Sequence, residues 1–249
     1  MPSLGSHMAR ARTLAEQLKL SEVDADRGAF YLGSTAPDIR VLTRADRAET
    51  HFFDLDNLDR QDPVERMLAA HPRLRKPSGL EASTTAFIAG YITHLVLDEA
   101  WIEEVYRPTF GVYSDIDNDP RSNVLDRVLQ YELDRQDRSD SRSRQELQTA
   151  LKASAPPEDI PFIDRTFLTR WFQMVSEIAQ AAPDYSGFRR MMSRHLAGAG
   201  FSETDIDAYC RDPVPIVEEA VSIVSADRIV RFWEHAADVM SMRVRQYLR

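Results

Sequence analysis

The segment from Glu81 to Val105 constrains the fold more than any other, because it is long, almost entirely apolar, and carries His94 and Asp98 in its interior. Its apolar residues recur at helical spacing and Pro108 follows its end, so the pattern predicts one long helix. A helix that is apolar on all sides is buried inside a protein. The segment is interrupted by Thr, Gly and His, so it lacks the roughly 20 consecutive apolar residues of a membrane span.

The rest of the chain repeats the helical spacing. Glycines number only 9 in 249 residues, and alternating apolar and polar residues are nearly absent. Further helices are predicted over residues 6–20, 26–34, 63–70, 118–136, 163–182, 185–198, 202–210 and 215–248, the last with a bend near Ser225. Residues 136–144, rich in serine and charge, are expected as a surface linker. The sequence therefore predicts an all-α fold, a single multi-helix domain over residues 1–249 with a long central buried helix.

Composition narrows the class of function. The chain has 31 basic and 40 acidic residues, and the resulting net charge of −9 repels phosphate backbones, which makes nucleic acid an unfavoured partner. Its single cysteine, Cys210, excludes an intrachain disulfide and a cysteine-rich zinc site, so a transition metal would need histidine and carboxylate ligands. The first residues lack a secretory pattern and no membrane span is predicted, which favours a cytoplasmic location. Nothing in the pattern defines an oligomeric state.

His94 and Asp98 are four residues apart in the long predicted helix, so both project from one face, one turn apart. A carboxylate in apolar surroundings must be paired, hydrogen-bonded or bound to a metal, because an unpaired buried charge is costly. Two interpretations remain open at this point. The commoner is a hydrogen-bonded His-Asp pair in the core, and the other is a pair of ligands to one metal ion.

Three further polar residues lie in apolar or tightly turned surroundings. Asp38 follows a predicted helix end, where an aspartate commonly caps a turn. His51 precedes two aromatic residues, Phe52 and Phe53, and such apolar surroundings are typical of a hydrogen-bonded histidine in the core. His7 lies where a flexible tail is the default. Each residue therefore has a structural interpretation beside its interpretation as a metal ligand.

The order of His7, Asp38, His51 and the pair His94-x3-Asp98 resembles the zinc-dependent phospholipase C family, whose all-α fold is shared with single-strand-specific nucleases. The most similar stretches are GAFYLGSTAPD, residues 28–38, and GYITHLVLD, residues 90–98. The resemblance covers about the first 105 residues. It implies hydrolysis of phosphate esters by zinc ions in a cleft between helices.

The resemblance also implies a role for each residue. One zinc would be held by Asp38, His51, His94 and Asp98. Asp98 would bridge to a second zinc, which His7 and the amine and carbonyl of the N-terminal residue would hold. Asp38 would be the catalytic residue, because a ligand carboxylate has a second oxygen free to orient or deprotonate a metal-activated water.

The chain departs from the family at the third zinc. The family holds that ion with a histidine about six residues after the helix aspartate and with a later His-x3-Glu pair. Here Glu104 occupies the first position, and Asp126 and Gln130 have the spacing of the pair. Either these residues form a replacement site for a harder ion, such as Mg²⁺, or there is no third site. One or two zinc ions are therefore expected.

The expected function is a metal-dependent hydrolysis of phosphoric esters, with a small phosphate ester or a lipid head group as the substrate. The alternative is a non-catalytic protein that binds one metal and has lost the third site. A nuclease would share the fold but fits poorly with the net charge. Metal content discriminates, since a catalytic centre of this kind should hold two or more ions per chain.

Overall fold

The computed structural model describes residues 1–117 and 119–249, and over these residues the chain forms helices, turns and loops without a strand. Its central element is α7 (Ala82–Trp101), which continues through a π-helical turn (Ile102–Tyr106) into the short helix α8 (Arg107–Thr109). Every residue of α7 from Thr84 to Asp98 is buried. The prediction of an all-α, single-domain fold around a long buried helix is confirmed.

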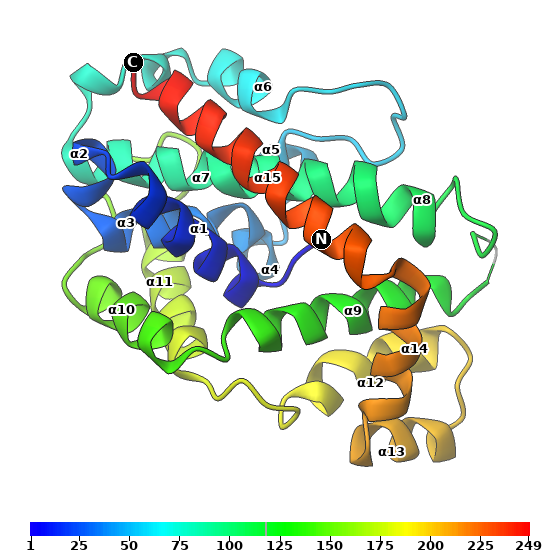
Figure 1. Ribbon diagram of the computed structural model, residues 1–249. Helices are drawn as coiled ribbons and strands as arrows, with labels where there is room; N and C mark the ends of the chain where they lie inside the picture. The colour runs from blue at the N-terminus through cyan, green and yellow to red at the C-terminus, as the bar shows by residue number, and fades with distance from the viewer. Residues whose placement is uncertain (118) are drawn as a thin grey trace.

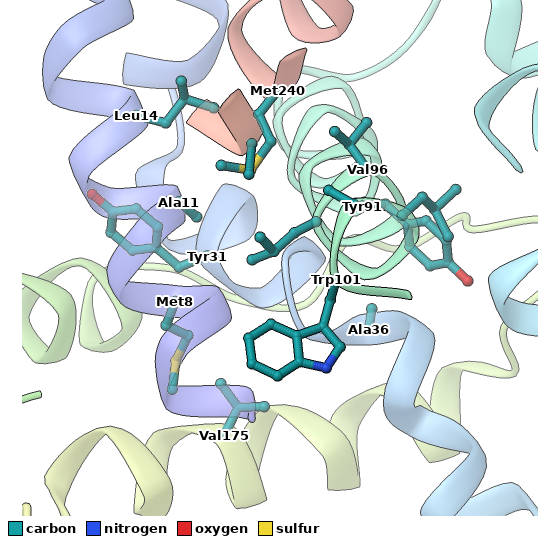
Figure 2. Close-up of a cluster of buried hydrophobic side chains, with 14 of the residues drawn as sticks. Met8, Ala11, Leu14, Tyr31, Ala36, Tyr91, Val96, Trp101, Val175 and Met240 are labelled. Atoms are coloured by element: carbon teal, nitrogen blue, oxygen red, sulfur yellow. The ribbon is translucent and has the colours of Figure 1, made fainter. Parts of the chain in front are cut away.

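Amphipathic helices pack around α7 and cover it. Those that bring residues to the site or cover it are α1 (Leu4–Leu18), α3 (Arg27–Gly33), α5 (Arg47–His51) and α15 (Ala226–Tyr247). In Figure 1, α15 crosses in front of α7, and the two helices pack together. Figure 2 shows how Met8 and Leu14 of α1, Trp101 of α7 and Met240 of α15 meet in one buried cluster. Burial of these apolar faces is what holds the helices around α7.

The remaining helices complete the outer part of the domain. They are α2 (Ser21–Asp24), α4 (Arg40–Thr43), α6 (Pro63–Ala70), α9 (Ser122–Asp137), α10 (Ser141–Lys152), α11 (Arg165–Gln180), α12 (Phe188–Gly198), α13 (Glu203–Arg211) and α14 (Val214–Val224). Short 3₁₀ segments cover Ala36–Ile39, Pro72–Arg75 and Pro77–Gly79. None of the helices in the described ranges has both the length and the apolar character that crossing a bilayer requires.

Two glycines allow α3 and α7 to approach each other closely. A Cβ atom at Gly90 would lie 1.9 Å from the carbonyl oxygen of Phe30, and one at Gly33 would lie 2.0 Å from the carbonyl oxygen of Phe87. Since heavy atoms cannot approach so closely, both helices need glycine where they cross. The crossing brings Ser34, at the end of α3, against the middle of α7.

Two segments differ from the simple pattern predicted by the sequence. Residues 136–144 contain the end of α9 and the first turn of α10, which begins because the carboxylate of Asp140 accepts hydrogen bonds from the backbone N–H groups of Arg142 and Ser143. The single bent helix predicted over residues 215–248 is instead two helices, α14 and α15. They are separated at Ser225, whose φ of 66° lies outside the right-handed helical region.

Candidate metal centre

The Asp98 carboxylate lies at the centre of a buried cluster of histidines. Tyr91, His94 and Asp98 follow one another at spacings of three and four residues, so they lie on one face of α7. Oδ1 of Asp98 lies 3.4 Å from Nε2 of His7. Its other oxygen, Oδ2, lies 3.4 Å from Nε2 of His51 and 3.5 Å from Nε2 of His94. Spacing alone left two interpretations of His94 and Asp98, a core pair and a pair of metal ligands. In the structure these two residues are part of one larger cluster that also contains His7 and His51.

His94 is held in a single orientation by the backbone of α3. Its Nδ1 lies 2.9 Å from the carbonyl oxygen of Ser34. Since a carbonyl oxygen can only accept, Nδ1 carries the proton. Nε2 then faces Asp98 and makes no hydrogen bond to any described residue. A ring with one nitrogen fixed by a carbonyl and the other free is the usual arrangement of a histidine metal ligand.

Helix α5 faces the same side of α7 and orients His51. The hydroxyl of Tyr91 donates a hydrogen bond to the carbonyl oxygen of Thr50. The hydroxyl of Thr50 lies 3.4 Å from the carbonyl oxygen of Arg47 and 3.0 Å from Nδ1 of His51. Because a hydroxyl has one proton, donation to Arg47 leaves its oxygen to accept from Nδ1–H of His51. Nε2 of His51 is therefore the nitrogen free to bind a ligand.

His7 enters the cluster from the first turns of α1. Its ring stacks on the ring of His94, with centroids 3.8 Å apart and an angle of 10° between the planes. The residue is 1% exposed and helical, which excludes the interpretation of His7 as part of a flexible tail. Burial and the neighbouring His94 lower the pKa of His7 to about 4. At neutral pH the ring is uncharged, the form that binds metals.

Asp38 lies in the 3₁₀ segment Ala36–Ile39 and is the member of the cluster that solvent reaches. Its Oδ1 is 3.4 Å from Nε2 of His51, and its side chain is 27% exposed against 4% for Asp98. Burial raises the pKa of Asp38, but the neighbouring imidazoles of His51 and His94 together hold it well below its usual range. The carboxylate is therefore ionised at neutral pH.

Arg47 is a member of the cluster that the sequence did not reveal. Its Nη2 donates a hydrogen bond of 2.9 Å to Oδ2 of Asp98. Burial alone raises the pKa of Asp98, but His94, His7 and Arg47 outweigh it and hold that pKa well below its usual value. The only local signal was the four-residue spacing of Arg47 and His51, which is common on exposed helices.

The unpaired atoms of this cluster fit a bound zinc ion. Both nitrogens of His7, Nε2 of His51 and His94, and Oδ1 of Asp98 are buried and have no hydrogen-bond partner in the described part of the chain. Zinc binds histidine nitrogen and carboxylate oxygen at about 2.0–2.1 Å in a tetrahedron, so its ligand atoms lie about 3.3–3.4 Å apart. The separations of 3.4–3.5 Å within the cluster agree with that value. Donor atoms of His7, His94 and Asp98 lie within 4.8 Å of one another, as do those of Asp38, His51 and His94.

The residues considered for a third site are engaged by other side chains. Glu104 pairs with His235 and lines a cavity of about 540 Å³. Asp126 accepts hydrogen bonds from Nε1 of Trp101 at 3.0 Å and from the amide of Gln130 at 2.6 Å, and it lines a different cavity of about 520 Å³. Glu104 is thus paired with a histidine and both oxygens of Asp126 with neutral donors, and neither residue belongs to a group of metal-ligand donors found among the described residues.

Three histidines and two aspartates thus gather at tetrahedral separations in an all-helical fold, and these groups could hold a metal ion. Residues 6–101 match the family model described as zinc dependent phospholipase C, and this region contains all five residues of the cluster. The predicted resemblance to the zinc-dependent phospholipase C family is confirmed over this region. A search of curated proteins and a search of solved structures found no match.

Proposed function

We propose that this protein hydrolyses phosphoric esters at a zinc centre held by His7, Asp38, His51, His94 and Asp98. The observation that carries the proposal is the set of buried, unpaired nitrogen and oxygen atoms that face one another across Asp98 in the described residues. A buried polar atom without a partner costs about 1–3 kcal/mol, so a set of them is retained where a ligand pairs them. The match of residues 6–101 to a zinc-dependent family supports zinc as that ligand.

The side chains divide into two overlapping groups that could hold the metal. One group is His7, His94 and Asp98, and the other is Asp38, His51 and His94. A bound zinc would supply Lewis-acid chemistry, lowering the pKa of a water and neutralising charge on a phosphoryl group. The hydrogen bonds that Nδ1 of His94 donates to Ser34 and Nδ1 of His51 donates to Thr50 fix which nitrogen of each ring is offered.

Asp38 is the residue proposed to handle the proton. It is ionised, and it is the more exposed of the two carboxylates, so a water can approach it. Asp38 would accept a proton from the water while the oxygen of that water attacks phosphorus. The P–O bond to the alcohol then breaks, and Asp38 returns this proton to the departing alcohol oxygen. General-base assistance of this kind contributes about 10²–10⁴-fold to a rate.

The substrate proposed is a small phosphate ester or a lipid head group. The net charge of −9 opposes a long polyanion but not a single phosphate, because a metal centre outweighs the distant charges at short range. Phosphodiesters with different alcohols would therefore compete for the centre better than single-stranded DNA.

The test is a hydrolysis assay on protein purified without chelator, with zinc measured by elemental analysis. Wild-type protein is compared with Asp38→Asn and with the control Asp59→Asn, all at saturating zinc, on bis(p-nitrophenyl) phosphate and on phosphatidylcholine vesicles. Asp59 is an exposed aspartate eight residues after His51, and its side chain makes no hydrogen bond or ion pair within the described residues. We expect zinc in all three proteins and a kcat at least about 10²-fold lower in Asp38→Asn alone.

Two results would contradict the proposal. Wild-type protein that binds no zinc would remove the metal centre. Zinc-loaded protein that hydrolyses neither substrate, or Asp38→Asn with the kcat of wild type, would leave a metal-binding protein in which Asp38 has no catalytic role.

A further inference from the structure

The contact between Arg47 and Asp98 is the one ion pair in which a cluster carboxylate meets an arginine among the described residues. The guanidinium is 11% exposed and the carboxylate 4% exposed, so both charges are largely removed from water. An exposed ion pair contributes little to stability, but removing one partner of a buried pair leaves the other uncompensated. Arg47 therefore directly compensates the buried negative charge of Asp98.

Helix α5 is attached to α7 at two points, and both lie on the face that carries the cluster. Tyr91 donates to the carbonyl oxygen of Thr50, and Asp98, two turns further along α7, accepts from Arg47. Arg47 and His51 are four residues apart, so one face of α5 presents both. The geometry couples the position of His51 to the hydrogen bond made by Arg47.

The orientation of Asp98 follows from this contact. With Oδ2 held by Arg47 and facing His51 and His94, the other oxygen, Oδ1, is directed at His7. Rotation of the carboxylate would move both oxygens away from the ring nitrogens. Partners that hold a ligand carboxylate in this way commonly account for 10–100-fold in metal affinity.

We propose that Arg47 is a positioning residue of the metal centre, which holds the Asp98 carboxylate so that one oxygen faces His7 and the other faces His51 and His94. This inference rests on the zinc centre proposed above. Arg47 acts through Asp98, and its positive charge also balances the two carboxylates of the cluster before a metal is bound.

The experiment measures zinc affinity and the cobalt spectrum of metal-free protein reloaded with each ion. Zinc affinity is obtained by competition with a chromophoric chelator for wild type, Arg47→Gln, Arg47→Lys and the control Arg44→Gln, an exposed arginine three residues earlier. We expect a 10–100-fold loss in Arg47→Gln, a smaller loss in Arg47→Lys, which keeps a cationic donor, and no more than a twofold change in Arg44→Gln. The visible spectrum of bound Co²⁺, which reports coordination geometry, should change in Arg47→Gln.

Each outcome bears on one of the two proposals. Zinc affinity and cobalt spectrum equal to wild type in Arg47→Gln, or a higher affinity, would overturn the positioning role while leaving the zinc centre intact. A lower thermal stability with an unchanged spectrum would do the same, because it would make Arg47 a support for α5 only. If Arg47→Gln does not fold, the affinity and spectrum of Arg47→Lys decide in the same way. Wild-type protein that binds no zinc would instead overturn the proposed function, and this inference with it.

Discussion

The imidazole of His7 stacks face to face on the imidazole of His94, with ring centroids 3.8 Å apart. Two rings this close cannot both carry a positive charge without strong repulsion in a buried site. The pKa of His7 is lowered to about 4 by burial and by His94. The pKa of His94 is pulled down by burial but raised overall by the carboxylates of Asp98 and Asp38. In the metal-free protein His7 is therefore the neutral member of the stack.

The first prediction concerns the pH dependence of the metal-free protein. The pKa of His7 is about 4 when folded and about 6.5 when unfolded, so between these values the unfolded chain binds more protons. Stability attributable to His7 is present above pH 6.5 and is lost as the pH falls to 4, on the order of 3 kcal/mol in total. Urea unfolding at pH 7.5 and pH 4.5, with chelator present, should show a smaller loss in His7→Gln than in wild type. Equal losses in both proteins would contradict this assignment.

The second prediction concerns removal of the metal. Binding to the folded state alone stabilises a protein, by about 2.7 kcal/mol at a hundredfold excess over Kd. A chelator should therefore lower the melting temperature of wild-type protein, since the buried donors are left unpaired. In Asp98→Asn, which keeps the shape of the side chain but loses its charge, zinc content should fall and the melting temperature should no longer respond to chelator. Asp59→Asn serves as the control, and a chelator response of Asp98→Asn equal to wild type would exclude Asp98 as a ligand.

The third prediction concerns the crossing of α3 and α7. In Gly90→Ala the new methyl group would meet the carbonyl oxygen of Phe30, and overpacking of this kind costs about 1–3 kcal/mol. The displaced α3 would also carry Ser34 away from His94, so zinc affinity should fall with stability. Gly198→Ala is the matched control, because that glycine is helical with no other atom within 4 Å of the added Cβ, and it should be neutral or slightly stabilising. Wild-type zinc affinity in a destabilised Gly90→Ala would contradict this prediction, because it would show that the crossing of α3 and α7 does not affect the metal centre.

The fourth prediction concerns Glu104 and Asp126. Because these carboxylates pair with His235 and with Trp101 and Gln130, the variants Glu104→Gln and Asp126→Asn should retain the zinc content of wild type. Asp126→Asn should lose some stability, since one of its two hydrogen-bonding oxygens becomes an amide donor. A lower metal count in either variant, measured by elemental analysis, would show that these residues hold an ion after all.

The local parts of the centre could be predicted from the sequence, because helical spacing alone places His94 beside Asp98. His7, Asp38 and His51 came from the resemblance to a family, since no local pattern brings residues so distant in the chain together. Arg47 was missed because its partner is Asp98, on another helix, and an arginine on a short polar helix has no distinguishing spacing. Glu104 could not be placed by counting residues, because it lies in the π-helical turn, where the α-helical repeat no longer applies.

The third-site residues also show why position in a motif does not define a ligand. Asp126 and Gln130 do have the expected four-residue spacing on α9, and they do lie one turn apart. They hydrogen-bond to each other, however, and Asp126 also binds the indole N–H of Trp101. The spacing predicts which side chains share a face of a helix. Which residues they contact depends on the helix that packs against that face.

Because α7 is buried on every side, the core can close only after all the helices that cover α7 have been synthesised. All five cluster residues precede residue 99 of this sequence, but α15, which is made after them, covers α7 and packs Phe232 against Trp101 with ring centroids 5.3 Å apart. A fragment ending after the π-helical turn would carry the whole donor set yet expose the apolar face that α15 covers, and such a face promotes aggregation. The nascent chain would therefore carry the proposed zinc ligands long before it has a closed core, and a stable form of the proposed centre would require α15 as well.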